Sequence, residues 1–474
     1  APPPDARLDA PPPDAAPPPD ARLDAPAPDA RADAPPLDAP VDAPADAPPP
    51  DARADAPPPD AAPADAPGQS DAPLCSALSC PSGCCAGNAC VNPPSNAQCG
   101  VPGAACAPCP MSQRCTAGVC VPEVCGAAAV VGSGDLPRLT ADGDHFVAAW
   151  RAGAHVVLQR LGANGAPAGA SVTQATTRPA LLLDVARYQG GLGLAWVESR
   201  PTSPTYGPTS SYARTYSTDL VAQGSPQLLP TSGSNWDQSE ELRVAAVGGG
   251  ASFIVAERIF TDSPGYGQRY RFGLFPAASP ASHEFDFVGT GSQSQGAEPR
   301  ISVADLPAGF ALSWLTRKDP SYNTPIAGFD AAGAQLWRVP TVYQFAIGKA
   351  QSVTYDGTDL LSLHHWGSWR NRSFDPANGS AGSLLTTLAY LDWPRASNAA
   401  YVGPYHLQLL ENSDGDLYTA RFDATGALLG PPTLIVNRAG GDCSGQCARV
   451  AVTATTIGLL YADGGTIAFL ALCR

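Results

Sequence analysis

Lysine is nearly absent from this 474-residue chain, which contains only Lys318 and Lys349. Two lysines form no basic stripe, so we expect no nucleic-acid partner. No apolar run approaches the roughly 18 residues that a membrane-spanning helix needs, so we expect no transmembrane segment. Met111 is the only methionine and the chain begins at Ala1, from which we expect a processed product whose signal peptide has been removed.

The motifs of common enzyme classes are also missing. The chain has no His-Glu-x-x-His zinc motif, no Gly-x-Ser-x-Gly turn and no glycine-rich phosphate-binding motif. The stretch Asn412–Tyr418 is the nearest to the Ser-x-Asp-x-Gly-x-Thr-Trp box of sialidase-like proteins, but it departs from that pattern. We interpret Asp414 and Gly415 as a hairpin turn, because a calcium loop needs about six to eight oxygen ligands. We therefore assign no catalytic residue, no metal and no cofactor.

Residues 1–73 consist almost wholly of Ala, Pro and Asp, and they carry −11 of the net charge of −15. Their large apolar side chains are only Leu8, Leu23, Leu37 and Val41, too few to offset the entropy lost on ordering. Proline and repelling aspartates favour an extended chain of about 3.1 Å per residue. The composition predicts a disordered stalk that holds a domain away from a surface. An unselected disordered leader is the alternative.

A cysteine-rich module is expected at residues 74–122, because ten of the 14 cysteines lie there. So short a segment cannot form an adequate hydrophobic core, and it contains no histidine, so we expect disulfides rather than zinc. The sequence does not fix their pairing. A Cys-x-x-Gly-x-Cys ending occurs at Cys115–Cys120 and, displaced by one residue, at Cys85–Cys90. The ten are Cys75, Cys80, Cys84, Cys85, Cys90, Cys99, Cys106, Cys109, Cys115 and Cys120.

From residue 123 onward, short apolar segments alternate with Gly, Asp and Asn turns at a period of roughly 50 residues. The clearest copy begins at Pro137-Arg138-Leu139 and ends its second segment at Trp150. Pro299-Arg300-Ile301 begins a similar copy that reaches Trp314. The other copies begin near Pro179, Arg243, Val353, Tyr405 and Arg449.

Each copy predicts a set of short strands. Turns such as Asp142-Gly143 supply the positive φ that tight hairpins need. Phe146 and Trp150 fall on one face of a strand and Val147 on the other, so both faces are apolar. A single sheet cannot bury both faces, but seven sheets arranged radially can. The sequence therefore predicts an all-β fold, a seven-bladed β-propeller at residues 123–474, whereas tandem sandwiches would need a linker near the middle.

The ends of this domain suggest how the ring closes. The last copy has three strands, and an orphan apolar segment, residues 127–131, precedes the first copy. We expect the orphan segment to complete the last blade and a Cys125–Cys473 disulfide to lock the ring. Cys443 and Cys447 are expected to pair with each other.

Loop aromatic residues mark the predicted binding face. Long insertions occur at similar places in several copies, and repeat insertions often map to a binding surface. His364 aligns with Trp150 and is expected in the core, whereas the Trp and Arg residues after it are expected on a loop that could stack on sugars or hold carboxylates. Local packing at the blade edge is the alternative. The candidate binding residues are Tyr206, Trp236, Tyr266, Tyr322, Trp366, Trp369 and Arg370.

The stalk, cysteine knot and repeats of the Asp-Gly…Phe-x-x-x-Trp type together resemble bacterial secreted and surface proteins. The resemblance implies an exported protein that displays a propeller for binding an extracellular glycan, peptide or protein. The localisation it implies is extracellular or on the outer cell surface, with a lipid anchor ahead of Ala1 as one means of attachment. We expect a monomer and lean against catalysis.

Two alternatives remain. One is a carbohydrate-active propeller hydrolase or lyase, which would need two carboxylates about 5–9 Å apart at the mouth of the ring. The other is a purely structural surface spacer. The carboxylates available to an enzyme are Asp237, Glu240, Glu241, Asp262 and Asp319.

Overall fold

The structure is a computed structural model. It contains a small disulfide-rich module and a much larger β-sheet domain. It describes residues 75–92, 94, 98–109, 113–116, 118–122, 124–199, 209–229, 238–261, 267–276, 282–289, 301–318, 321–340, 342, 344–345, 350–365, 368–387, 395–412, 414–438 and 447–473. The predicted stalk, residues 1–73, lies outside them. The described residues contain strands and turns but no helix, and so no helix that could cross a membrane.

The cysteine-rich module contains two hairpins with the same disulfide pattern. Strands β1 (Cys84–Ala86) and β2 (Ala89–Val91) form the first, and β3 (Gln113–Thr116) and β4 (Val119–Pro122) form the second. In each hairpin two cysteines face each other across the strands, Cys85 opposite Cys90 and Cys115 opposite Cys120. Each of the four is bonded to an earlier cysteine of its own half. The pairs are Cys75–Cys85 and Cys80–Cys90, then Cys99–Cys115 and Cys109–Cys120.

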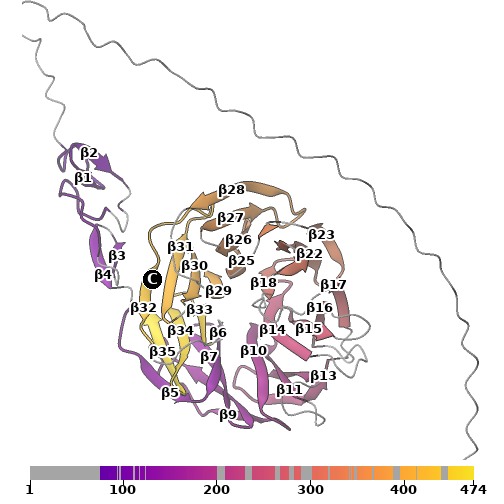
Figure 1. Cartoon of the computed structure of the whole chain (residues 1–474). Helices are drawn as coiled ribbons and strands as arrows, with labels where there is room; N and C mark the ends of the chain where they lie inside the picture. Colours follow the sequence, from indigo (N-terminus) through magenta and orange to yellow (C-terminus); the bar gives the residue numbers. More distant parts are fainter. Residues whose placement is uncertain are drawn as a thin grey trace, which may run out of the picture. The chain divides into compact units, whose positions relative to one another are not determined.

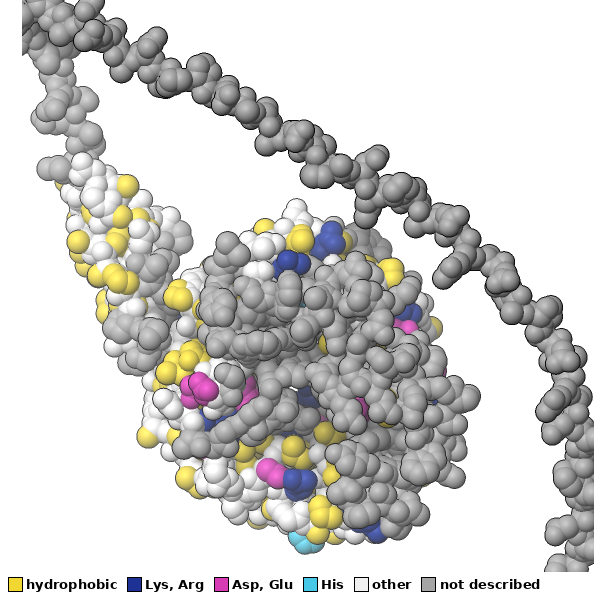
Figure 2. All heavy atoms as spheres, in the orientation of Figure 1, with side chains coloured by type: hydrophobic (Ala, Val, Ile, Leu, Met, Phe, Trp, Pro, Cys, Tyr) yellow, Lys and Arg dark blue, Asp and Glu magenta, His cyan; other side chains and the backbone are white. Residues whose placement is uncertain are grey.

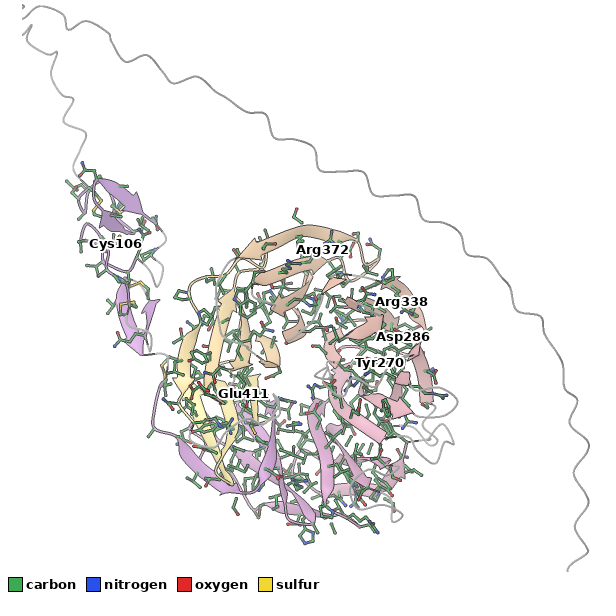
Figure 3. The ribbon with its side chains drawn as sticks, viewed as in Figure 1. Cys106, Tyr270, Asp286, Arg338, Arg372 and Glu411 are labelled. Atoms are coloured by element: carbon green, nitrogen blue, oxygen red, sulfur yellow. A yellow bond between two sulfur atoms is a disulfide. The ribbon has the colours of Figure 1, made fainter. Side chains whose placement is uncertain are left out.

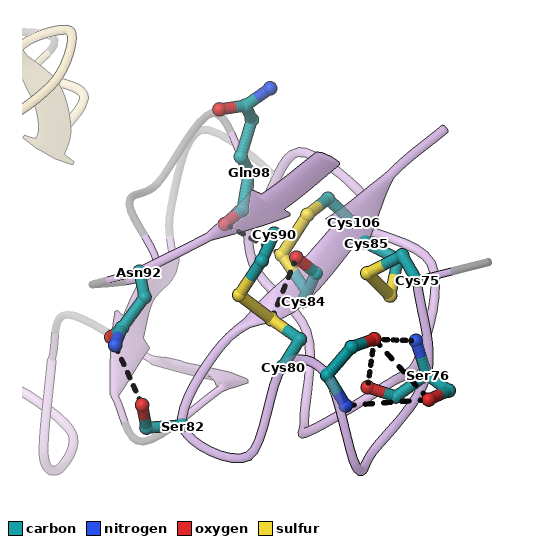
Figure 4. The surroundings of a disulfide bond; sticks show 11 residues. Cys75, Ser76, Cys80, Ser82, Cys84, Cys85, Cys90, Asn92, Gln98 and Cys106 are labelled. Carbon is teal, nitrogen blue, oxygen red and sulfur yellow. Dashed lines mark hydrogen bonds between the residues drawn. A yellow bond between two sulfur atoms is a disulfide. The ribbon is translucent and has the colours of Figure 1, made fainter. Parts of the chain in front are cut away.

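A fifth disulfide, Cys84–Cys106, joins the two halves of the module. Figure 4 shows this bond beside Cys75–Cys85 and Cys80–Cys90, with the Asn92 side chain donating a hydrogen bond to Ser82 Oγ at 2.6 Å. The sulfur atoms of Cys99, Cys109 and Cys120 lie within 4.8 Å of one another. All three are in disulfides, so they offer no thiolate to a metal.

The propeller consists of seven four-stranded antiparallel sheets (Figure 1), which confirms the predicted fold class. The first four blades follow one another along the chain. Blade 1 is β6 (Asp135–Asp142), β7 (His145–Ala152), β8 (His155–Leu161) and β9 (Val172–Ala175); blade 2 is β10 (Ala180–Tyr188), β11 (Gly191–Ser199), β12 (Thr209–Tyr216) and β13 (Ala222–Leu228); blade 3 is β14 (Gln238–Val247), β15 (Ser252–Thr261), β16 (Gly267–Phe275) and β17 (Ser282–Gly289); blade 4 is β18 (Ile301–Leu306), β19 (Gly309–Trp314), β22 (Ile326–Asp330) and β23 (Gln335–Val339).

Blade 4 also carries an inserted sheet that the sequence did not predict, made of β20 (Thr316–Lys318), β21 (Ser321–Asn323) and β24 (Gln344–Phe345). The remaining blades complete the ring. Blade 5 is β25 (Ala350–Tyr355), β26 (Leu360–His365), β27 (Trp369–Phe374) and β28 (Ala381–Thr387); blade 6 is β29 (Arg395–Tyr401), β30 (His406–Glu411), β31 (Leu417–Phe422) and β32 (Thr433–Val436); blade 7 is β33 (Ala448–Val452), β34 (Ile457–Asp463), β35 (Thr466–Leu472) and β5 (Ala129–Ser133).

Strand β5 closes the ring, because it precedes blade 1 in sequence but pairs with β35 of blade 7. The Cys125–Cys473 disulfide predicted from the sequence is present beside this junction, and Cys125 N donates to the carbonyl of Ala471 at 2.9 Å. Gly132 of β5 lies against the Trp150 ring so closely that a Cβ would meet it at 2.6 Å. Cys447 is also disulfide-bonded, whereas Cys443 lies outside the described residues.

The core is divided into seven hydrophobic clusters, and each lies between two neighbouring blades. Phe146 and Trp150 of β7 belong to the cluster with blade 7, and Val147 belongs to the cluster with blade 2. The two apolar faces predicted for this strand are therefore both buried. His364 is also buried, as expected from its alignment with Trp150.

Polar contacts reinforce the junction of blades 3 and 4. Asp286 accepts hydrogen bonds from Trp314 Nε1 at 2.7 Å and from Arg338 Nη2 at 3.1 Å. Tyr270 donates its hydroxyl to the carbonyl of Leu315. Figure 3 labels Tyr270, Asp286 and Arg338 in this part of the ring.

The predicted turns have the expected backbone. Gly143, Gly165, Gly357 and Gly415 all adopt positive φ, between 62° and 102°. The side chain of Asn412 accepts hydrogen bonds from the amides of Asp414 and Asp416, so this segment is a hairpin turn between β30 and β31, as predicted.

Candidate functional site in the axial channel

One cavity of about 300 Å³ lies on the axis of the propeller. Its wall is formed by the inner strands of all seven blades: β6, β10, β14, β18, β25, β29 and β33. These strands contact one another in sequence around the ring, and β33 returns to β6 (Figure 1). A volume of this size lies at the lower end of the range for small-molecule sites, roughly 300–1,000 Å³.

The strand register places one residue of each inner strand at the same level of this channel. In blade 1, Arg138 pairs with Ala149, the residue before Trp150. In each of the other blades, the corresponding residue is the strand partner of the residue that precedes the position equivalent to Trp150. The resulting ring, from blade 1 to blade 7, is Arg138, Asp184, Arg243, Ser302, Ser352, Asn398 and Arg449.

Hydrogen bonds between neighbouring inner strands hold the channel wall in place. A side chain of one strand accepts from a backbone N–H of the next strand at five junctions among the described residues. The acceptor and donor pairs are Thr140 and Arg187 (3.2 Å), Asp184 and Val244 (2.9 Å), Glu241 and Ile301 (2.7 Å), Ser302 and Val353 (2.8 Å), and Asn398 and Val450 (3.0 Å). The blades are thus joined by polar contacts along the channel wall as well as by their apolar clusters.

The three ring arginines adopt the same local arrangement. Each Nη1 donates to the carbonyl of the preceding residue: Arg138 at 2.8 Å, Arg243 at 3.0 Å and Arg449 at 2.9 Å. Arg138 and Arg449 are 1% and 4% exposed. Three guanidinium groups, contributed by blades 1, 3 and 7, therefore lie in or beside the channel.

Two carboxylates accompany these arginines. Asp184 Oδ1 lies 3.6 Å from Arg138 Nε, and Glu241 Oε1 lies 2.8 Å from Arg243 Nη2. Each carboxylate also accepts one of the backbone hydrogen bonds between blades. This cluster therefore has three cations and two anions, and both anions already support the wall.

Burial makes the arginine charges costly. The pKa of Arg138 is lowered to about 10, mainly by burial; Asp184 opposes this shift and the nearby Arg243 adds to it. The pKa of Arg449 is lowered well below its ordinary value, first by burial and then by Arg138 and Arg243, against the opposing effect of Asp184 and Glu241. The guanidinium groups thus lie close enough to repel one another in a poorly solvated site.

The aromatic binding face predicted from the sequence falls mostly outside the described residues. Tyr206, Trp236, Tyr266 and Trp366 lie there, so their role stays a prediction. Tyr322 belongs to β21 of the inserted sheet, and only its backbone is described.

Trp369 and Arg370 are not on a loop, as the sequence had suggested, but in strand β27. Trp369 is fully buried and packs edge-on against Phe422 of blade 6, with ring centroids 4.8 Å apart. The indole offers no surface to a ligand because it fills the junction of blades 5 and 6. The loop placement was wrong because β26 continues to His365 and β27 already begins at Trp369.

Of the five carboxylates considered for an enzyme, two belong to the described residues and three do not. Glu240 forms an ion pair with Arg258 at 2.8 Å, and the buried Glu241 forms one with Arg243, also at 2.8 Å. Asp237, Asp262 and Asp319 lie outside the described residues.

The channel arginines were missed as a site, although the sequence contained a signal for them. Arg138, Arg243 and Arg449 each stand at the start of a repeat copy, before an apolar residue. The sequence comparison matched Arg300 to Arg138, but the strand register puts Ser302 at that level. A charged residue that recurs at one position of an inner strand indicates a ring of side chains around the axis.

No protein-family model matches the chain, and no curated protein matches it. The chain is similar to solved propeller structures. The polysaccharide lyase Uly1 has a TM-score of 0.46 and 13% identity, with 74% of this chain and 92% of that chain covered. The β-propeller domain of Cps50 (Swd1) from Myceliophteria thermophila has a TM-score of 0.45 and 10% identity, with 74% and 99% covered. The propeller domain of the trilobed protease from Pyrococcus furiosus has a TM-score of 0.41 and 10% identity, with 73% and 96% covered. Likenesses this distant carry no statement about ligand or reaction.

Proposed function

We propose that this chain is an exported binding protein whose propeller takes a small ligand in its axial channel. The observation that carries the proposal is a cavity to which the inner strands of all seven blades contribute, with polar side chains at one level of its wall. A closed ring holds such a site in a fixed geometry, so little ordering entropy is lost when a ligand enters.

Export is supported by the disulfides. Five bonds staple the module and a sixth joins the two ends of the propeller. Disulfides of this density persist in oxidising compartments outside the cytosol. Display at the cell surface, on a stalk formed by residues 1–73, is part of the proposal and rests on the composition of that segment.

Binding is favoured over carbohydrate cleavage by the state of the channel carboxylates. A hydrolase needs one carboxyl as a proton donor and another as a nucleophile or base. Asp184, which lines the cavity, and Glu241, which is buried on the neighbouring inner strand, each contact an arginine and accept a backbone N–H. Both carboxylates thus have structural partners that an acid–base role would disturb.

The test is a ligand screen on the oxidised, full-length chain. Neutral and acidic mono- and disaccharides, amino acids and short peptides are compared by thermal shift, because a ligand that binds only the folded state raises the melting temperature. Compounds that raise it are then titrated calorimetrically.

Replacing an alanine by leucine at two different positions locates the binding site. Ala246→Leu adds volume to the channel wall, whereas Ala222→Leu makes the same change on the exposed strand β13. The proposal expects Ala246→Leu to weaken binding at least tenfold and Ala222→Leu to leave it unchanged. A screen without any ligand, or a ligand that is equally insensitive to both substitutions, would contradict it.

A further inference from the structure

The arginine ring suggests which chemistry the channel accepts. Arg138, Arg243 and Arg449 come from blades 1, 3 and 7, yet each has the same hydrogen bond to its own strand. One Nη1 hydrogen of each group is engaged in this way. A guanidinium carries five N–H donors in a planar fork, and that geometry matches the oxygens of an oxyanion.

The charge of the cluster points the same way. Three guanidinium groups share the region with two carboxylates, and Arg243 also lines the cavity wall beside Arg449. An anion in the cavity would face guanidinium groups of blades 3 and 7 at the same time.

The uncharged members of the ring fit this arrangement. Ser302, Ser352 and Asn398 stand at the same level on blades 4, 5 and 6. Ser352 accepts a hydrogen bond from Gln408 Nε2 at 3.2 Å, and Asn398 bonds both backbone groups of Val450. The ring thus has three arginines and Asp184 on blades 7, 1, 2 and 3 and neutral side chains on blades 4, 5 and 6, which would orient a ligand that carries its negative charge at one end.

We propose that the axial channel is an oxyanion-binding site in which Arg243 and Arg449, which line the cavity, hold the carboxylate, sulfate or phosphate group of a small ligand, with the buried Arg138 behind them. This inference rests on the proposed function, because it names the chemical class of the ligand that enters the channel. The pKa values of Arg138 and Arg449 are lowered first by burial and also by the neighbouring arginines, which is consistent with a site that attracts a negative charge.

The experiment titrates sodium sulfate, phosphate and acetate into the oxidised, full-length chain at constant ionic strength, with chloride as the replacement salt and acetamide as the neutral analogue of acetate. Calorimetry and melting temperature are both recorded. The three oxyanions distinguish which group the site prefers. Sulfate and phosphate stabilise folded proteins in general, so the decisive quantity is the saturable part that depends on the ring.

Arg449→Gln removes one ring charge and is the main variant, and Arg243→Gln is the second in case the first does not fold. Arg372→Gln is the matched control, because Arg372 lies on β27 away from the axis, with its Nε on the carbonyl of Gly382 (Figure 3). We expect saturable binding of at least one oxyanion and none of acetamide. Each ring variant that folds should bind the oxyanion at least tenfold more weakly, and Arg372→Gln should bind it with unchanged affinity.

Oxyanion binding that survives in the ring variants, or no saturable binding of any oxyanion, would overturn the inference. These results are separate from those that test the proposed function. If the channel binds a neutral compound in the ligand screen but no oxyanion, the proposed binding function is supported and the oxyanion inference is wrong. A channel that binds oxyanions while the screen yields no ligand removes the proposed function and retains the oxyanion site.

Discussion

Cys473 is bonded to Cys125, a residue that lies 348 positions earlier in the chain. The bond sits where β5 pairs with β35, so it fixes the only junction of the described ring at which a blade is assembled from both ends of the domain. The last blade therefore depends on a covalent link as well as on its strand pairing.

We predict that replacing Cys125 and Cys473 together by serine lowers the free energy of unfolding by roughly 5 kcal/mol, because the disulfide restricts a very long loop in the unfolded chain. Urea denaturation measures this change. The matched control is the double serine variant of Cys109 and Cys120, whose bond belongs to the module. It should leave the propeller transition in place, and a propeller equally stable without Cys125–Cys473 would contradict the closure role.

Asn398 should be a strong contact between blades 6 and 7. Its amide accepts from Val450 N at 3.0 Å and donates to Val450 O at 2.7 Å. We predict that Asn398→Ala destabilises the propeller by about 1–3 kcal/mol, because two backbone groups lose their partner. Asn378→Ala, in an exposed turn, should change stability by less than about 0.5 kcal/mol. Equal effects at the two sites would show that the contact between the blades is dispensable.

Asp305 should make stability depend on pH. Burial raises the pKa of its carboxyl from 3.8 to about 6, partly offset by the backbone N–H of Gly249. The folded state therefore disfavours the ionised form, so stability is lost as the pH rises from about 4 to about 6 and stays low above that range. We predict that Asp305→Asn stabilises the chain at pH 7.5 by about 1–2 kcal/mol, a value reduced for the partial exposure of the group.

Denaturation of both forms across pH 3.5 to 7.5 checks this effect. The two curves should converge at the acid end, where Asp305 is protonated in the folded and unfolded states alike. A constant difference at every pH would assign the effect of the substitution to packing instead.

Trp369 should behave as a core residue and not as a ligand-binding residue. We predict that Trp369→Ala costs about 3–5 kcal/mol of stability, because it empties the junction with Phe422. Trp369→Phe should cost less and leave ligand affinity in the channel unchanged. A Trp369→Ala variant with full stability and lost binding would instead support the aromatic face expected from the sequence.

The architecture could be predicted because each blade of a propeller has the same short sequence pattern of apolar strands and glycine turns. Phe146 and Val147 are neighbours that face different blades, and the turn at Gly143 recurs in other copies, so repeats and apolar faces revealed the sheets. The closing strand could be predicted for the same reason: it was the one apolar segment without partners. The cysteine pairing could not, because it depends on how two hairpins fold back on earlier loops.

The candidate site could be predicted far less well. Aromatic residues such as Trp369 look alike in sequence whether they fill a blade junction or line a mouth, and only the strand register separates the two. The arginine ring depends on residues about 100 to 310 positions apart that meet at one level of the axis. Their spacing has meaning only after the register of each hairpin is known, as the mismatch between Arg300 and Ser302 shows.

The most direct test of the account is a crystal of the oxidised protein soaked in selenate, an oxyanion whose position is visible by anomalous scattering. The account predicts an anomalous peak in the axial cavity, within hydrogen-bonding distance of Arg243 or Arg449, and its loss in Arg449→Gln. An empty channel in crystals that show selenate only at surface arginines such as Arg372 would contradict it.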